Sequence, residues 1–344
     1  MEKTFLLSSG FEYDGYGAHC TARGILDLNI GFVPVCTDEV KFKFRKSILN
    51  VYSFYYIEKK YKTFKGQKVL VTEPYLLPKK SLRIPIKKAV IVHDFYVFNK
   101  DYISNIKKLP IKKRLFRTLF LLRKLQKSYN NIKFYDNVIV FDLKAKYRLV
   151  KEFGVDGNKI SVFQVNIIDN SYQPSSNKQK NNEKKIIGYI NGFGANKAEK
   201  LRLFIEHFKN LKDNSIEFHI CGKGFPFSDL IKRDSRIKYF GFLPEERIVE
   251  TYNSFDVYLS TSTMEGFGLP IMKAKACKVP VLCYDGDLID IVKRNTLVWN
   301  ENNIDEILKN REWNRVDVEK AYEDVEETRP AAVKKNMQHF LESF

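Results

Sequence analysis

The sequence has no apolar run of about eighteen residues, the length that a helix needs to cross a bilayer. Near the amino terminus, residues 1–10 hold an apolar core too short for a signal peptide, and they predict a first buried strand that ends in a glycine turn. No internal repeat or long low-complexity tract is present. A membrane-spanning segment, a secretory leader and a repeat architecture are therefore not expected.

Cysteine is also scarce. The five cysteines have neither the spacing of a metal site nor that of a small disulfide scaffold. They are Cys20, Cys36, Cys221, Cys277 and Cys283. Free thiols are the simplest account, and they predict a protein of the reducing cytoplasm.

What is abundant is positive charge, and it is unevenly placed. The 344 residues carry a net charge of +18, and residues 1–170 hold 32 of the 59 basic residues but only 15 of the 41 acidic ones. A basic half indicates an anionic partner, such as a membrane surface, a phosphorylated lipid or glycan, or nucleic acid. A lysine-rich surface that is simply solvated is the alternative.

Short apolar runs alternate with longer amphipathic segments, a pattern typical of doubly wound α/β domains. The chain length fits two such domains. Predicted buried strands are 68–72, 89–93 and 137–141, then 186–190, 216–220, 237–240, 256–260 and 279–283. Residues 171–185 are polar and predict a linker. We expect two Rossmann-like domains, 1–170 and 186–325, facing across a cleft where ligands bind, with a terminal helix in 326–344 that packs back on the first domain.

The most informative segment is Glu265-Gly-Phe-Gly-Leu-Pro270, which follows a predicted strand and opens a helix at Leu269. Gly266 and Gly268 let the backbone approach a ligand closely. The exposed amides and the positive end of the helix favour a diphosphate. The Glu265 carboxylate can accept hydrogen bonds from sugar hydroxyls. On its own, the pattern also fits an ordinary strand-to-helix turn.

The stretch 263–281 closely resembles the donor site of family-4 retaining glycosyltransferases, which have the GT-B fold. In that family Glu-Gly-Phe-Gly-Leu-Pro leads into a helix and then Gly-x-Pro-Val, and a second Glu, eight residues after the first, binds the nucleotide ribose. Glu265 matches the first Glu, but Lys273 occupies the second position. A lysine donates where a glutamate accepts, which puts the usual ribose contact in doubt.

Other parts of the carboxy-terminal half match the family in order. Residues 186–197 resemble its strand and loop, with Lys197 as the lysine that neutralises the departing diphosphate, whereas Gly192 stands where the family has an arginine. Gly222 belongs to a segment like the family's Gly-x-Gly. Residues 239–243 resemble the loop that holds the base through its backbone, which places Phe242 and Leu243 beside the donor.

The amino-terminal half resembles the family more loosely. Gly15 and Gly17 lie in a glycine-rich loop like the one that covers the diphosphate and acceptor, although a plain turn is the alternative. His93 matches the family's histidine at the cleft floor, where it would contact the transferred sugar; a structural histidine is the other interpretation. Residues 138–168 resemble the last unit of the family's first domain.

The resemblance implies a metal-independent retaining glycosyltransferase whose co-substrate is a nucleotide-diphosphate sugar, with no further cofactor. Asp285-Gly-Asp287 has the form of a metal motif from the other large glycosyltransferase fold, but its late position predicts a polar loop. The expected catalytic residues are His93, Lys197 and Glu265. The expected donor-binding residues are Gly15, Gly17, Gly192, Gly222, Phe242, Leu243, Gly266, Phe267, Gly268, Leu269 and Lys273.

The positive charge of the amino-terminal half indicates the kind of acceptor to expect. Residues 106–125 combine cations with leucines on one helical face, Leu115, Leu119, Leu122 and Leu125, as in a basic helix that lies on an anionic membrane. This favours a glycan or lipid-linked acceptor at the inner face of the membrane. Alternatives are a leucine face packed into the domain, a DNA-base glucosyltransferase, a non-catalytic sugar-nucleotide-binding protein, and a related epimerase or phosphorylase.

Overall fold

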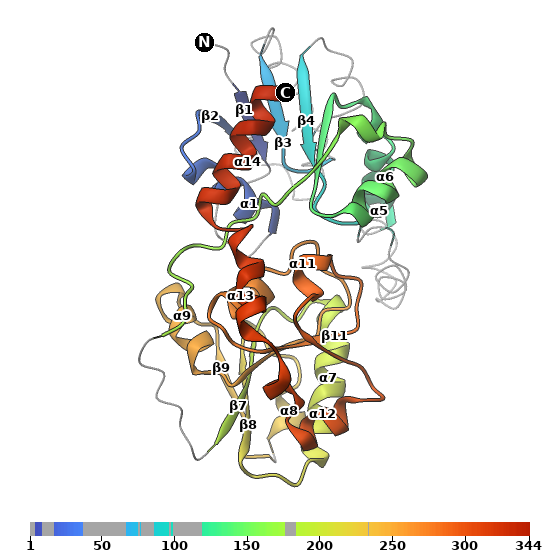
Figure 1. Cartoon of the computed structure of the whole chain (residues 1–344). Coiled ribbons are helices and arrows are strands. Elements are labelled where there is room, and N and C mark those ends of the chain that lie inside the picture. The colour runs from blue at the N-terminus through green and yellow to red at the C-terminus, as the bar shows by residue number, and fades with distance from the viewer. Residues whose placement is uncertain are drawn as a thin grey trace, which may run out of the picture. The chain divides into compact units, whose positions relative to one another are not determined.

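A computed structural model describes residues 4–8, 17–36, 67–74, 76, 86–95, 98, 119–175, 184–232 and 234–344 of the chain. The chain divides into two compact units. The first unit comprises Met1–Ile167 together with Pro330–Phe344, and the second comprises Ile168–Arg329 (Figure 1).

The first unit contains a six-stranded sheet in the order β2-β1-β3-β4-β5-β6, and every neighbouring pair is parallel. Its described elements are β1 (Thr4–Ser8), α1 (Gly17–Asp27), β2 (Phe32–Cys36), β3 (Lys68–Val71), β4 (Lys87–Ile91), α5 (Leu119–Tyr129), η4 (Ile132–Phe134), β5 (Asn137–Val140), α6 (Leu143–Phe153), η5 (Gly157–Lys159), β6 (Ile160–Val162) and α14 (Pro330–Ser343). The middle strands are nearly continuous in apolar residues because helices cover both faces of a parallel sheet.

The second unit repeats this plan with the order β12-β11-β10-β7-β8-β9, again all parallel. Its elements are β7 (Lys185–Ile190), α7 (Ala195–Asn210), β8 (Ile216–Cys221), α8 (Ser228–Ile231), β9 (Ile237–Gly241), α9 (Glu245–Ser254), β10 (Val257–Ser260), α10 (Leu269–Ala276), β11 (Val281–Tyr284), α11 (Asp290–Lys293), β12 (Leu297–Trp299), α12 (Ile304–Asn310), η6 (Glu312–Arg315) and α13 (Val318–Glu326). The predicted fold class, α/β with two Rossmann-like domains, is confirmed.

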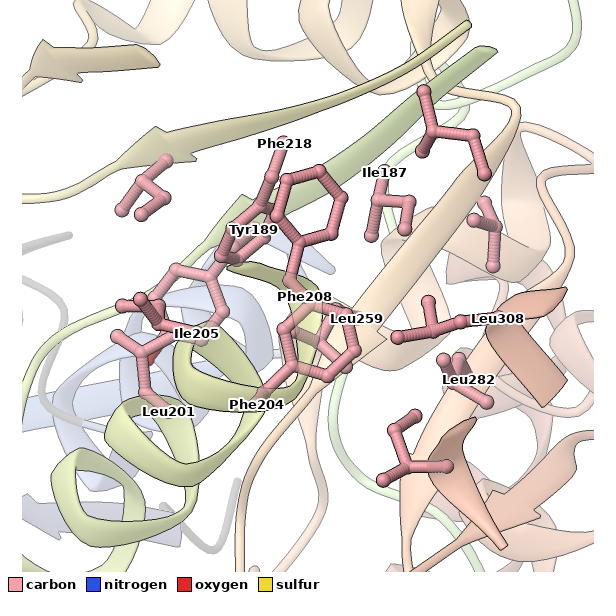
Figure 2. Close-up of a cluster of buried hydrophobic side chains, with 14 of the residues drawn as sticks. Ile187, Tyr189, Leu201, Phe204, Ile205, Phe208, Phe218, Leu259, Leu282 and Leu308 are labelled. Carbon is pink, nitrogen blue, oxygen red and sulfur yellow. The ribbon is translucent and has the colours of Figure 1, made fainter. Parts of the chain in front are cut away.

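Large aromatic side chains fill the core of the second unit. Phe204 and Phe208 of α7 pack on Phe218 of β8 (Figure 2). Phe204 also meets Trp299 edge-on. The strand glycine Gly188 is required there, because a Cβ on it would lie 2.0 Å from the Phe255 ring. Close packing of this kind fixes the position of β7 and β10, whose ends carry the candidate site.

The largest differences from the predicted strand boundaries are at β4 and β11, where they reach two residues. β4 ends at Ile91 rather than at residue 93, so His93 lies in the loop that follows the strand. β11 begins at Val281 rather than at residue 279, because Pro280 has no N–H to donate and contributes only its carbonyl, which accepts from the Tyr258 N–H.

Residues 171–175, which begin the segment expected as a linker, are hydrogen-bonded to the second unit. Ser175 N–H donates to the Asn253 side chain at 2.8 Å, and Asn253 donates to the Gln173 carbonyl. Lys185 already begins β7. At the other end of the chain, α14 belongs to the first unit, where the Leu341 carbonyl accepts from Lys68 at 3.3 Å.

Helix α10 is tied to α11 and α13 through a buried lysine. The Lys275 side chain is 0% exposed, and its ammonium donates to the carbonyls of Ile291 and Arg294 and to the Asp324 carboxylate at 2.7 Å. Arg294 and Asn295 also bind this carboxylate. Burial lowers the pKa of Lys275. The charge pair therefore holds together three helices behind the candidate site.

Among the described helices, none is long and apolar enough to cross a membrane. No disulfide involves the four cysteines whose side chains are described, which are Cys20, Cys221, Cys277 and Cys283. Residues 96–97 and 99–118, which include most of the predicted basic amphipathic segment, lie outside the described residues.

Candidate active site

The candidate site is built on two loops of the second unit. One loop, 191–194, connects β7 to α7, and the other, 261–268, connects β10 to α10. β7 and β10 are parallel neighbours in the sheet, so both loops emerge at the same edge. The carboxyl edge of such a sheet is where ligands bind in open α/β domains.

Asn196, in the first turn of α7, joins the two loops. Its backbone carbonyl accepts from both the N–H and the hydroxyl of Thr263, at 2.9 and 3.1 Å. Its side-chain amide donates to the Met264 carbonyl at 3.0 Å. Next to it, the Lys197 carbonyl accepts from the Thr261 hydroxyl at 3.1 Å. The backbone that leads to Glu265 is therefore held in place by α7.

Lys197 and Glu265 meet at this junction. The Lys197 Nζ lies 2.7 Å from the Glu265 Oε1, and the two side chains are 15% and 19% exposed. The same carboxylate oxygen accepts from the Ser262 hydroxyl at 2.7 Å, and Ser262 is fully buried. A cation and an oriented carboxylate thus stand together, 68 residues apart in sequence and still partly open to solvent.

Ser262 is a residue that sequence reasoning missed. Its hydroxyl fixes one oxygen of Glu265, which leaves the second carboxylate oxygen for other partners. The available signal was its position three residues before Glu265, the spacing of a local side-chain turn. Ser262 therefore positions the carboxylate rather than facing a ligand itself.

Helix α10 begins at Leu269, four residues after Glu265. Gly268 is its N-cap with φ +66°, a left-handed conformation that favours glycine, and a Cβ there would lie 3.0 Å from Val292. Gly266 and Leu269 flank this turn and remain partly exposed, whereas Phe267 is 6% exposed and packs inside the unit. The amino-terminal end of α10 therefore follows Glu265 closely in the chain, and the Phe267 ring is directed into the unit.

The segment Asp285-Gly-Asp287 supports this loop from behind. A Cβ on Gly286 would lie 2.7 Å from the Ser262 and Thr263 carbonyls, and the Asp287 N–H donates to the Thr263 carbonyl at 2.8 Å. Asp285 forms an ion pair with Lys293 at 2.7 Å. No group of three or more potential metal ligands occurs among the described residues. Gly286 and Asp287 therefore pack against the 261–268 loop and support it.

Gly192 follows β7 and Gly222 follows β8, so both glycines lie at the carboxyl edge of the sheet. Gly192 is exposed, and its carbonyl accepts from the Tyr189 hydroxyl at 2.9 Å. No atom lies within 4 Å of a Cβ placed on Gly192, so close packing does not require a glycine here. At Gly222, by contrast, a Cβ would lie 2.2 Å from the Asn191 carbonyl. Only the second glycine is required by close packing.

Three further residues of the predicted donor site lie in the second unit. Phe242 follows β9 and is 74% exposed, and Leu243 is half-buried. Lys273 lies just over one turn into α10, and its ammonium is 4.5 Å from the centre of the Tyr172 ring. This cation–π contact gives Lys273 a partner that a glutamate would not have.

In the first unit, His93 follows β4 by two residues and its ring meets Phe141 edge-on at 5.5 Å. Its Nε2 is buried and has no hydrogen-bond partner among the residues described. Burial lowers the pKa of His93 to about 4, opposed by a hydrogen bond with the Thr72 backbone. The imidazole is therefore neutral near pH 7. Gly17 opens α1, whereas Gly15 lies outside the described residues.

The lowered pKa of His93 predicts a pH dependence of stability. In the unfolded chain His93 titrates near 6.5, and in the folded chain near 4, so the unfolded state binds more protons between these values. The free energy of unfolding is therefore expected to fall as the pH drops through this window, by up to about 1.4 kcal/mol per pH unit. Urea titrations from pH 4 to 8 measure it.

The His93→Gln variant should lose this component, because glutamine does not titrate. The exposed His339 offers the matched control, and His339→Gln should retain the wild-type pH dependence. Equal slopes for wild type and His93→Gln would contradict the assignment of a buried, neutral imidazole.

The family match to known proteins lies in the second unit. Residues 173–313 match the family described as glycosyl transferases group 1. Over 82 residues, 23% of the chain, the sequence is 37% identical to the O-antigen chain mannosyltransferase B of Escherichia coli, and covers 22% of that protein. Over 131 residues, 34% of the chain, it is 28% identical to the poly(ribitol-phosphate) alpha-N-acetylglucosaminyltransferase of Staphylococcus aureus, and covers 26% of that protein.

The whole chain also resembles solved structures. The Anabaena protein Alr3699/HepE in complex with UDP and glucose superposes with a TM-score of 0.64 at 13% identity, over 100% of both chains. At such identity the likeness shows the fold alone. The matches to the curated relatives span about a quarter of their length. The chain has the GT-B fold, and residues 173–313, within its second unit, match the glycosyl transferases group 1.

Proposed function

We propose that the chain transfers a sugar from a nucleotide-diphosphate sugar to a hydroxyl acceptor, with retention of anomeric configuration and without a metal. The observation that carries the proposal is the Lys197–Glu265 pair at 2.7 Å beside the first turn of α10. Two oppositely charged groups and the amino-terminal end of a helix at one sheet edge match the needs of a sugar joined to a diphosphate.

The chemistry follows from charge development. As the bond between the anomeric carbon and the phosphate oxygen breaks, negative charge grows on the diphosphate, where Lys197 and the positive end of the α10 dipole stabilise it. Glu265 accepts hydrogen bonds from hydroxyls of the donor sugar. The acceptor oxygen forms the new bond on the same face, and its proton passes to the departing diphosphate oxygen. His93, neutral near pH 7, would contact the transferred sugar as a hydrogen-bonding group.

The relatives guide the choice of donor and acceptor. The similar Anabaena structure holds UDP and glucose, which supports uridine diphosphate sugars as the first donors to test. The names of the two curated relatives refer to an O-antigen chain and to poly(ribitol-phosphate), and they support a glycan or anionic acceptor. The basic first half of the chain agrees with such an acceptor, and a nucleic-acid acceptor is the weaker alternative.

The decisive experiment measures donor hydrolysis and transfer over a panel of nucleotide sugars. Glu265→Ala should lower turnover at least roughly tenfold, because hydrogen bonds between a carboxylate and the donor sugar are lost. Its circular dichroism and melting temperature should stay close to wild type, since Glu265 is partly exposed. Turnover is measured with the donor that wild type uses best.

Glu206→Ala is the matched control. Glu206 also lies in the second unit and pairs with a cation, Arg202, but on an exposed helical turn. Turnover of this variant should stay within about twofold of wild type. Normal turnover in Glu265→Ala would remove the donor-site assignment. Nucleotide binding without hydrolysis or transfer of any donor would instead favour a non-catalytic binding protein.

A further inference from the structure

Helix α6 of the first unit has two apolar faces. The inner face packs in the core of the unit, where Leu149 is 0% and Phe153 9% exposed. The outer face carries Leu143, Tyr147 and Val150, which are 73%, 64% and 42% exposed. Large side chains that pack in no core and gather on one element commonly mark an interaction surface.

The three outer residues form one stripe. Their spacing of four and then three residues places them on the same side of an α-helix. Lysines flank the stripe: Lys144 and Lys151 follow along one border, and Lys146 lies on the other. The Lys151 ammonium lies 5.4 Å from the Tyr147 ring. We call these six residues the α6 stripe.

Negative charge near the stripe is compensated. Glu152, on the far side of the helix, is bound by Arg148 at 2.9 Å. Asp142 is buried and caps the helix by accepting from the Ala145 N–H at 2.7 Å. Gly154, in the left-handed conformation, ends the helix. The stripe is therefore short, apolar along its centre and positively charged on both borders.

We propose that the α6 stripe docks the chain on an anionic lipid bilayer. A leucine, a tyrosine and a valine suit the boundary between acyl chains and headgroups, where a tyrosine keeps its hydroxyl in water. Lys144 and Lys151 on one border reach anionic headgroups while their methylene stems cover apolar surface, whereas Lys146 donates to the Ile160 carbonyl at 3.2 Å. The excess of basic residues in the first half of the chain adds attraction at longer range.

The charge and apolar character together favour this occupant over others. A nucleic acid would be bound by the lysines but would leave the apolar centre in water. A protein interface would be expected to deplete lysine. The stripe is also separate from the basic segment before residue 119, which lies outside the described residues. The proposal concerns where the chain binds and does not depend on the reaction that it catalyses.

Vesicle co-sedimentation of the full chain tests the proposal. The probes are neutral phosphatidylcholine vesicles and vesicles that also contain phosphatidylglycerol. Wild type should bind the anionic vesicles, and binding should weaken with salt. Each basic residue near an anionic surface contributes roughly fivefold in partitioning. Lys144→Glu/Lys151→Glu and Leu143→Ser/Tyr147→Ser/Val150→Ser should therefore each weaken binding at least about tenfold.

The matched control is Lys334→Glu/Lys335→Glu, which makes the same charge change at exposed positions of α14 in the same unit. It should change binding less than about threefold. An equal loss in this control would overturn the proposal, because general attraction of a basic protein would then suffice. Wild-type binding by the serine variant, no binding by wild type, or tighter binding to duplex DNA than to vesicles would each overturn it too. Circular dichroism confirms that every variant is folded.

Discussion

The Lys197→Ala variant is expected to turn over donor about a hundredfold more slowly than wild type, because a fixed cation beside the leaving group is lost at a partly buried site. Lys197 is 15% exposed and stands on α7, so its charge is already oriented when the glycosyl–phosphate bond breaks. Since that charge matters most in the transition state, the larger change should be in kcat rather than in KM. Initial rates of donor hydrolysis and transfer measure both.

Two variants separate the role of Lys197 from that of Glu265. If Lys197 acted only by holding the Glu265 carboxylate, the double variant Lys197→Ala/Glu265→Ala would be no slower than Glu265→Ala alone. We expect it to be slower. Lys200→Ala is the control, because Lys200 is on the same helix but pairs with Glu301. Recovery of Lys197→Ala by divalent metal would show that charge neutralisation has been assigned to the wrong group.

The Asp324→Ala variant is expected to lose about 3–5 kcal/mol of unfolding free energy, because it leaves the Lys275 ammonium buried without its counter-charge. The ammonium would keep the carbonyls of Ile291 and Arg294, but neither carries a full charge. Arg294 would lose the same carboxylate. Urea denaturation with circular dichroism measures the loss.

Two further variants serve as comparisons for Asp324→Ala. Lys275→Met removes the buried charge while keeping much of the side-chain volume, and should cost clearly less than Asp324→Ala. Glu319→Ala, on the same helix, breaks the more exposed pair with Lys278 and should cost less than about 1 kcal/mol. A small effect of Asp324→Ala would mean that Lys275 is neutral or hydrated in the folded chain.

Local patterns sufficed to predict the alternation of strands and helices. Strands such as β3 and β5 are short apolar runs buried on both faces, and such runs carry their own signal. β12 was not predicted, because its three residues are too few for a period. The ends of β4 and β11 were misplaced because pairing with neighbouring strands, and not the local sequence, decides where a strand stops.

For the candidate site, too, some residues could be predicted from local sequence patterns and others could not. Glu265, the glycines around it and Lys197 carry recognisable spacing, and the structure places Lys197 beside Glu265. Ser262 and the Lys275–Asp324 pair were missed, because a single serine or a charge pair 49 residues apart leaves no pattern in one sequence. From the sequence alone, a lysine that is buried beside a distant carboxylate cannot be distinguished from an exposed lysine.

The hydrogen bonds of Asn196 have a consequence for the thermodynamics of donor binding. Because this residue fixes the 261–268 loop from within the folded unit, the loop keeps its conformation without ligand. Ordering one residue costs about 1–2 kcal/mol of backbone conformational entropy, and here that cost belongs to folding rather than to binding. Nucleotide binding should therefore cost little conformational entropy at this loop. The Thr263 amide, which donates to the Asn196 carbonyl, should be protected from hydrogen exchange in the absence of donor.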